Sequence, residues 1–282
     1  MEIDDVMQDT EFRGLARIRR LRPVRISTWS RDRTGKSPSG KPPRSTDLLI
    51  ASYNIHKAVG RDRRFDPARI VDVIDEIGAD IIALQEADQR FGERAGLLDL
   101  EALKRRTGLI AAPVQGRGHG WHGNVVLFRP GIVTATREIV LPGVEPRGAL
   151  IVDLSLPRGD VRIIGAHLGL LRHSRSRQVE TLIGAAKPTD GRPVFLMGDF
   201  NEWRVGRRSA LQGLAPKFGP LQAAIPSFPA RFPLLALDRI VAYPADLVAS
   251  VELHDSPLAR IASDHLPIKA QVHLLSEDRS PH

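Results

Sequence analysis

The chain has 282 residues, of which 42% are hydrophobic and 26% are charged, proportions that allow a sizeable buried core. It contains no cysteine, which excludes disulfides and cysteine-ligated zinc, and it lacks the run of about 18 apolar residues that a transmembrane helix needs. Acidic residues follow the first methionine where a secretory signal would carry bases, so we expect a cytoplasmic protein.

The net positive charge of +8 is concentrated near the N-terminus. Residues 13–44 contain eleven basic residues and one acid, which leaves 30 of the 41 basic and 32 of the 33 acidic residues for the rest. The segment 27–47 is rich in Ser, Pro and Gly, so residues 1–46 are predicted to be a disordered basic tail. We expect this tail either to remain solvated or to contact nucleic acid or an anionic membrane, the last making the protein peripheral to it.

From residue 47 onward, short apolar runs alternate with helical patterns and predict one folded domain over 47–275, followed by a short tail at 276–282. The expected elements are a strand at 48–53, helix at 66–79, strand at 80–86, helix at 97–106, strands at 124–128, 149–156 and 161–168, helix at 174–187, and strands at 193–197, 237–243, 247–253 and 266–274. Asp66 is the expected N-cap of the first helix, with Pro67 at its first position. No Walker loop or G-x-G-x-x-G motif is present, which disfavours nucleotide-binding folds of those kinds.

Polar side chains stand at the ends of several of these strands. They are Asn54 and His56 in SYNIH, Glu86 in LQE, His167 in GAHL, Asp199 and Asn201 in GDFN, Asp238 in LDRI, and Asp264 and His265 in SDHLP. Each one alone can be an ordinary turn residue. Asp238 is harder to explain in that way, because an unpaired carboxylate within an apolar strand is costly to bury. It needs a partner, and a histidine ring N–H would serve.

Taken in order, the motifs SYNI, LQE, HL followed by RSRQ, GDFN, LDRI and SDHLP resemble the endonuclease/exonuclease/phosphatase superfamily over residues 48–274. Its members include pancreatic-type deoxyribonucleases, abasic-site endonucleases, sphingomyelinases and inositol-polyphosphate phosphatases. The resemblance implies a single α/β (α+β) domain, a four-layer sandwich of two stacked mixed β-sheets flanked by helices. It also implies a hydrolase of phosphodiester or phosphate ester bonds that depends on Mg²⁺ or Mn²⁺.

The resemblance also implies a role for each polar residue at the strand ends. Glu86 would be the principal metal ligand with Asn54 and Asp264, Asp199 would activate water, Asn201, His167 and His265 would bind the phosphate, and Asp238 would orient His265. His167 is in addition a general-acid candidate. A set of acids, amides and imidazoles without a thiol suits Mg²⁺ or Mn²⁺ better than structural zinc.

Four further residues are secondary candidates for substrate binding: His56, Asn124, Arg175 and Arg231. Repair nucleases of the superfamily carry an acid at the position of His56, so the details of the metal network stay open. Asn124 lies in the Gly-rich loop GHGWHGN, which is expected either to line the cleft or to be a plain loop. Arg175 would support the loop after His167 or lie on a solvated helix face. Arg231 stands between two aromatics that serve either loop packing or a phosphate with an apolar or base-like neighbour.

Three functions remain open at this stage. The first is a phosphodiesterase acting on nucleic acid, and the second applies the same chemistry to a phospholipid or another small phosphoester. The nearly neutral domain and the loop with two phenylalanines slightly favour the second. The third is a catalytically inactive binding module, which the retention of every expected acid, amide and histidine disfavours. The sequence makes no prediction about oligomeric state.

Overall fold

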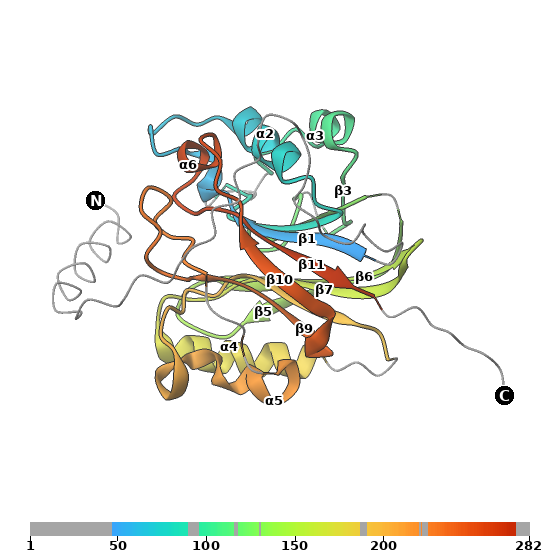
Figure 1. Ribbon diagram of the computed structural model, residues 1–282, viewed down its shortest axis with the longest axis vertical. Helices are drawn as coiled ribbons and strands as arrows, with labels where there is room; N and C mark the ends of the chain where they lie inside the picture. Colours follow the sequence, from blue (N-terminus) through green and yellow to red (C-terminus); the bar gives the residue numbers. More distant parts are fainter. Residues whose placement is uncertain are drawn as a thin grey trace, which may run out of the picture. The chain divides into compact units, whose positions relative to one another are not determined.

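The structure is a computed structural model that describes residues 47–89, 96–115, 118–129, 131–186, 191–219, 221 and 225–274. The tails predicted at 1–46 and 276–282 lie outside the described residues. Two mixed β-sheets, one with six strands and one with five, occupy the centre of the folded unit (Figure 1).

The first sheet has the strand order β10–β11–β1–β2–β4–β3. Its strands are β1 (Asp47–Asn54), β2 (Ile81–Gln85), β3 (Ile110–Ala111), β4 (Val125–Phe128), β10 (Val248–Leu253) and β11 (Ile268–His273). β1 is parallel to β2, with Asn54 opposite Gln85, and antiparallel to β11. The ends of β1 and β2 and the start of β11 therefore lie at the same edge of this sheet.

The second sheet has the order β5–β6–β7–β8–β9. Its strands are β5 (Ile132–Leu141), β6 (Arg147–Leu156), β7 (Gly159–His167), β8 (Val194–Asp199) and β9 (Asp238–Tyr243). β8 is parallel to β7 and antiparallel to β9, and the register places His167 opposite Asp199 and Asp199 opposite Asp238. His167, Asp199 and Asp238 therefore lie side by side on adjacent strands at one edge of this sheet.

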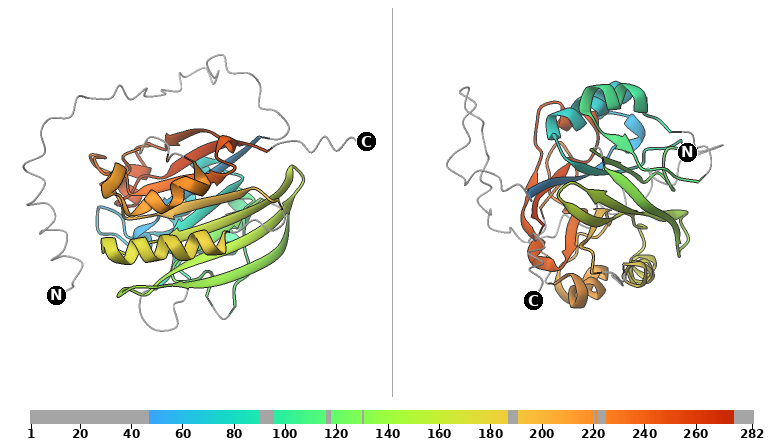
Figure 2. Two further views of the ribbon diagram at one scale, coloured as in Figure 1. Left: turned by 90° about the horizontal axis from the view of Figure 1, so that it is seen from below. Right: turned by 90° about the vertical axis from the view of Figure 1, so that its right-hand side faces the viewer.

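Helices cover the outer face of each sheet, α2 and α3 on the first and α4 and α5 on the second (Figures 1 and 2). The helices are α2 (Pro67–Ile77), α3 (Leu100–Thr107), α4 (Arg172–Ala185), α5 (Ala215–Phe218) and α6 (Ala259–Ala262), with short 3₁₀ helices η2 (His56–Ala58), η3 (Gly206–Arg208), η4 (Ala210–Leu214) and η5 (Ala245–Leu247). This arrangement confirms the predicted four-layer sandwich. Among the described residues, none of the helices has the length and hydrophobicity needed to cross a bilayer.

Apolar side chains fill the space between the sheets and the space under the helices. Ile50 and Phe128 from the first sheet meet Leu150 and Phe195 from the second in one buried cluster. Two further clusters pack α2 against the first sheet and α4 against the second. Close packing in these three clusters holds the strand ends, and hence the polar residues on them, in fixed positions.

The sequence predicted most of these elements and missed one long strand. Strand β5 was not predicted because it pairs only with β6, and most of its side chains are at least partly exposed, so it lacks a buried apolar run. The helix expected at 97–106 begins at Leu100, since the Asp99 side chain accepts hydrogen bonds from the backbone N–H groups of Glu101 and Ala102. The N-cap predicted at Asp66 is confirmed.

Candidate active site

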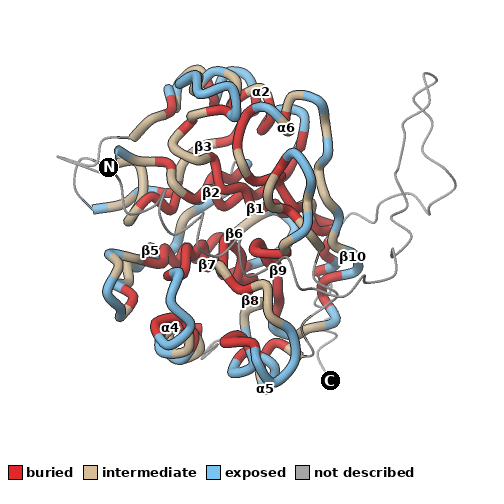
Figure 3. The backbone as a smooth tube through the Cα atoms, turned by 90° about the vertical axis from the view of Figure 1, so that its left-hand side faces the viewer, coloured by how far each residue is buried: buried red, intermediate tan, exposed pale blue. Residues whose placement is uncertain are grey.

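The ends of the two sheets meet at the candidate site. Asn54 ends β1 in the first sheet, and Asp199 ends β8 in the second sheet. Asn54 Nδ2 donates a hydrogen bond of 3.0 Å to Asp199 Oδ2, although the two residues are 145 positions apart in the chain. This bond joins the sheets at the edge that the predicted site residues occupy, and Figure 3 looks onto the loops of this edge.

The GDFN motif fixes the position of Asp199 through local contacts. Gly198 has a φ of +152°, and a Cβ at this position would lie 1.8 Å from the carbonyl oxygen of Ala166 on the neighbouring strand. The backbone N–H of Asn201 donates to Asp199 Oδ1 at 2.9 Å, and Asn201 Nδ2 donates to the carbonyl oxygen of Leu168 at 2.9 Å. Glycine therefore lets β8 approach β7 closely, and the turn that follows holds the carboxylate.

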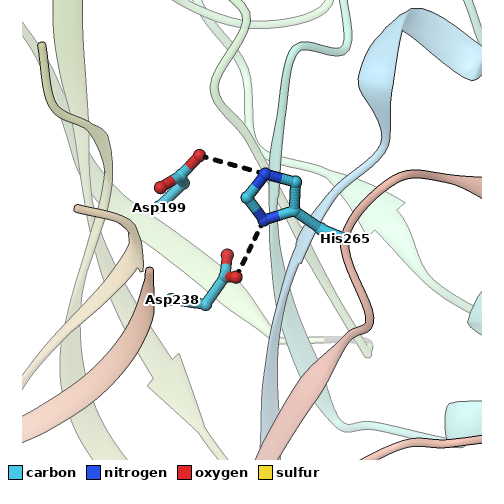
Figure 4. A group of neighbouring side chains, drawn as sticks. All are labelled: Asp199, Asp238 and His265. Carbon is cyan, nitrogen blue, oxygen red and sulfur yellow. Dashed lines mark hydrogen bonds and ion pairs between the residues drawn. The ribbon is translucent and has the colours of Figure 1, made fainter. Parts of the chain in front are cut away.

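The imidazole of His265 lies between two buried carboxylates (Figure 4). Its Nδ1 is 2.9 Å from Asp238 Oδ2, and its Nε2 is 3.7 Å from Asp199 Oδ2. The Ser227 hydroxyl donates to the same Asp238 oxygen at 2.5 Å, and the ring of Phe228 packs against His265 with 4.9 Å between ring centroids. His265 is thus the partner that a carboxylate buried in an apolar strand was expected to need.

Asp199, His265 and Asp238 form a buried row in which the imidazole and the carboxylates attract one another. Burial disfavours the protonated form of His265, but the negative charges of Asp238 and Asp199 outweigh it and raise the pKa of the imidazole well above its usual value. Burial raises the pKa of Asp199 to about 6, although His265 and the hydrogen bonds from Asn201 and Asn54 act in the opposite direction. At neutral pH the imidazole of His265 is therefore charged and the neighbouring Asp199 is ionised.

His167, on the other side of Asp199, is held in one tautomer. Arg147 Nη1 lies 3.0 Å from His167 Nδ1, and a guanidinium group can only donate, so Nδ1 accepts. The ring proton is therefore on Nε2, which lies 3.5 Å from Asp199 Oδ2. Burial and the positive charges of Arg147 and His265 lower the pKa of His167 well below its usual value. The arrangement favours a neutral hydrogen-bond donor over the charged imidazole that a general acid would use at neutral pH.

Glu86 lies directly after β2, beside Asn54. Its backbone has a φ of +56°, a left-handed conformation that is uncommon for residues other than glycine and asparagine. Strained backbone of this kind tends to occur at functional sites. The Glu86 side chain is 23% exposed, and Lys57 Nζ lies 3.7 Å from its Oε2. Its carboxylate is thus partly accessible to a ligand.

Asp264 and His56 complete this side of the site. The Asp264 side chain is 26% exposed and accepts a hydrogen bond from the Ser263 hydroxyl. His56 Nδ1 lies 3.0 Å from the carbonyl oxygen of Val59, so this nitrogen carries a proton and donates it. His56 therefore cannot bind a metal ion through Nδ1 in this conformation, whereas the Asp264 carboxylate can.

Two groups of residues are suited to a metal ion. Glu86, Asn54 and Asp264 offer oxygen atoms, which Mg²⁺ and Mn²⁺ prefer. Both carboxylates are partly exposed, whereas the Asn54 oxygen is buried and accepts a hydrogen bond from the backbone N–H of His56. The second group is Asp199, Asp238 and His265, whose ligand atoms all lie within 4.8 Å of one another. In the second group, however, the imidazole already donates a hydrogen bond from Nδ1 to Asp238, and its raised pKa favours a proton over a metal ion.

The secondary candidates occupy different positions. Arg175 is 2% exposed and donates to the carbonyl oxygens of Gly169 and Leu170, so the alternative of a solvated helix face is wrong and support of the loop after β7 is confirmed. The Asn124 amide is buried and donates to the carbonyl oxygens of Trp121 and Gly148. These bonds hold the Gly-rich loop, and substrate contact by either side chain stays a prediction.

Arg231 is exposed, and its guanidinium lies over the ring of Phe232, 5.3 Å from the centroid. Three residues that touch the site were not predicted: Lys57 beside Glu86, Arg147 beside His167, and Ser227 beside Asp238. The cost of burying Asp238 was a signal for a second donor such as Ser227. Arg147 gave no such signal, because it starts β6 after the strand that was missed.

The fold and the site define a class, the two-sheet α/β sandwich with acids, amides and imidazoles gathered at one loop edge. Residues 51–265 match the sequence model of the Endonuclease/Exonuclease/phosphatase family, and the chain therefore belongs to this family. Members of this family are generally hydrolytic phosphoesterases, and many depend on a divalent metal ion.

Three known proteins are similar to this chain. YbhP, an uncharacterized protein of Escherichia coli (strain K12), is 31% identical over 245 residues, which cover 80% of this chain and 96% of YbhP. An endonuclease/exonuclease/phosphatase from Beutenbergia cavernae has a TM-score of 0.62 at 23% identity, over 81% of this chain and 72% of its own. The mannosyl-6-phosphatase Bt3783 of Bacteroides thetaiotaomicron has a TM-score of 0.55 at 17% identity, over 80% and 99%. At these identities the two structures establish the fold alone.

Proposed function

We propose that the protein is a Mg²⁺- or Mn²⁺-dependent hydrolase of phosphate esters, and of phosphodiesters in particular. The observation that carries this proposal is the buried row in which His265 lies between Asp199 and Asp238, beside the neutral imidazole of His167. A row of this kind offers one proton acceptor and two hydrogen-bond donors to a single small anion. Membership of a family of phosphoesterases supports the same conclusion.

The metal ion would be held by Glu86, Asn54 and Asp264, whose oxygen atoms fit Mg²⁺ or Mn²⁺. When bound, such an ion neutralises phosphate charge and stabilises the oxygen that leaves. Partial exposure of Glu86 and Asp264 leaves lone pairs available for it. The hydrogen bond from Asn54 to Asp199 would link the ligands of the metal ion to the proton acceptor.

Asp199 would take a proton from the attacking water. Its pKa, raised to about 6, makes the carboxylate a stronger base than an ordinary aspartate while leaving it ionised at neutral pH. His265, kept charged by Asp238, would donate from Nε2 to a phosphate oxygen and stabilise the charge that develops there. His167 would donate from its own Nε2, and Asn201 would bind a phosphate oxygen from the GDFN turn.

The test is hydrolysis of a chromogenic phosphodiester by the purified full chain, in EDTA and after addition of Mg²⁺ or Mn²⁺. A chromogenic phosphomonoester forms the second arm, because one structural neighbour is named as a sugar phosphatase. We expect turnover that EDTA abolishes and added metal restores. Equal turnover with and without EDTA would contradict the metal dependence, and phosphate binding without any turnover would favour an inactive binding module.

A further inference from the structure

Large apolar side chains are exposed on three loops beside the candidate site. We call them the apolar rim: Phe65 (60% exposed), Phe232 (65%), Leu234 (71%) and Ile261 (45%). The rim residues come from the loop before α2, the loop before β9 and helix α6. Exposed apolar residues are normally scattered singly, so a group on adjoining loops calls for an explanation.

Hydrogen bonds hold these three loops side by side. The backbone N–H of Arg61 donates to the carbonyl oxygen of Ile261 at 2.9 Å. Arg260 Nη1 donates to the carbonyl oxygen of Arg231 at 2.9 Å, which ties α6 to the loop that carries Phe232. The loops that carry the apolar rim therefore adjoin one another, although the rim residues lie up to 196 positions apart in the chain.

The apolar rim adjoins the candidate catalytic residues. The backbone N–H of Ala230 donates to the carbonyl oxygen of Asp264 at 2.6 Å. Phe228, in the same loop as Phe232, packs its ring on the imidazole of His265. Whatever contacts the apolar rim is thus brought to the loops that hold the proposed site.

Exposed arginines lie on the same loops as the apolar rim. Four exposed arginines share its loops, and none of them forms an ion pair with a carboxylate among the described residues: Arg61, Arg63, Arg64 and Arg231. Of the acids nearby, Asp62 and Asp66 both pair with Arg69 and Asp255 pairs with Arg260, so the arginines of these loops outnumber the acids. These loops therefore combine exposed apolar side chains with an excess of positive charge.

The loops next to His167 and Asn201 repeat this combination. Four more exposed apolar residues lie on the loops next to His167 and Asn201: Val144, Leu170, Leu171 and Val205. Three exposed arginines without an ion pair among the described residues accompany them: Arg172, Arg207 and Arg208. The backbone N–H of Leu170 donates to Glu145, and Arg172 Nε donates to the carbonyl oxygen of Arg208, so these loops also adjoin one another. Apolar and cationic groups thus lie on both sets of loops that adjoin the site.

We propose that this surface docks the protein on an anionic phospholipid bilayer and that the ester it hydrolyses lies in a phospholipid headgroup. The inference rests on the proposed phosphoesterase function. Apolar side chains with a cationic border are the pattern of proteins that bind in the plane of a membrane, where the former enter the interface and the latter meet anionic headgroups. Nucleic acid fits less well, because two of the four rim residues, Leu234 and Ile261, have no aromatic face on which a base can stack.

The docking step is tested by flotation of the full chain with vesicles in EDTA, where no metal-dependent hydrolysis takes place. The vesicles contain phosphatidylcholine with or without phosphatidylglycerol. The double variant Phe65→Ser/Phe232→Ser is compared with Ile132→Ser, which changes an equally exposed residue (68%) at the far end of β5. We expect the double variant to bind phosphatidylglycerol vesicles at least about tenfold more weakly, and the control to bind like the wild type.

The substrate class is tested with Mg²⁺ on the same vesicles and on the soluble chromogenic phosphodiester. The ratio of vesicle hydrolysis to soluble hydrolysis should fall about tenfold in the double variant and stay unchanged in Ile132→Ser. Unchanged flotation and an unchanged ratio in the double variant would overturn the inference. So would a double variant that binds vesicles like the wild type but has lost binding to duplex DNA. Absence of all turnover, with flotation still dependent on Phe65 and Phe232, would instead count against the phosphoesterase function alone.

Discussion

The two sheets contribute different kinds of residue to the site. The second sheet supplies His167, Asp199 and Asp238, whose side chains are at most 3% exposed and bond to protein groups. The first sheet and its loops supply the buried Asn54 and His265 and, in addition, Glu86 and Asp264, whose side chains are 23% and 26% exposed. The buried half is therefore organised by the protein itself, whereas the exposed half keeps oxygen atoms available for something that binds.

The difference follows from the cost of burying charge. A carboxylate deep in the protein must find donors within the protein, and Asp199 finds them in Asn54 and the backbone of Asn201. A carboxylate at the loop edge can rely on water or an ion. We infer that the two halves have different roles: the buried half transfers the proton, and the exposed half binds the metal ion.

The largest expected effect comes from the buried half. Asp199→Asn keeps the shape of the side chain but removes the proton acceptor, and a positioned base typically contributes about 10²- to 10⁴-fold. We expect kcat/KM for a chromogenic phosphodiester to fall about 10³-fold, with the circular dichroism spectrum unchanged. A variant with more than a tenth of the wild-type rate would mean that the acceptor lies elsewhere.

The pH profile tests the same half without a substitution. Burial raises the pKa of Asp199 to about 6, and only the ionised carboxylate can accept a proton. The reaction should therefore accelerate as the pH rises, by about tenfold per unit below pH 6, and level off above it. A rate that is already constant from pH 4.5 upward would indicate that an aspartate with an ordinary pKa, or no aspartate, controls the reaction.

A smaller effect is expected from removing the hydrogen bond between Ser227 and Asp238. Ser227→Ala removes a buried donor to Asp238 and leaves that carboxylate with the imidazole of His265 as its partner. The free energy of unfolding in urea should fall by about 1–3 kcal/mol. Ser250→Ala, on the exposed edge strand β10, is the matched control and should stay within about 0.5 kcal/mol. Equal stability of both variants would show that Asp238 does not depend on the hydroxyl.

No effect on soluble substrate is expected from the N-terminal segment. Deleting residues 1–45 removes most of the basic excess but none of the residues that form the two sheets. Hydrolysis of the chromogenic phosphodiester should be unchanged within a factor of about two, the scatter ordinary for a change remote from the chemistry. A collapse of the rate would show that residues 1–45 belong to the catalytic domain.

The sequence predicted the buried half better than the surroundings of either half. A carboxylate within an apolar strand requires a partner, so the pairing of Asp238 with His265 was foreseeable, and GDFN placed Asp199 at a strand end. The tautomer of His167 was not foreseeable, since it depends on Arg147 beyond a strand that lacks a buried apolar run. The apolar rim could not be predicted either, because loop conformation alone decides which Phe or Leu is exposed.

The different roles of the two halves are tested most directly by Mn²⁺ binding, measured from the electron paramagnetic resonance signal of the free ion. Wild type is compared with Glu86→Gln in the exposed half and Asp238→Asn in the buried half. We expect Glu86→Gln to lose Mn²⁺ binding together with metal-dependent turnover, and Asp238→Asn to bind Mn²⁺ like the wild type while losing turnover. Loss of Mn²⁺ binding in Asp238→Asn with retention in Glu86→Gln would place the metal among Asp199, Asp238 and His265, and would contradict the account.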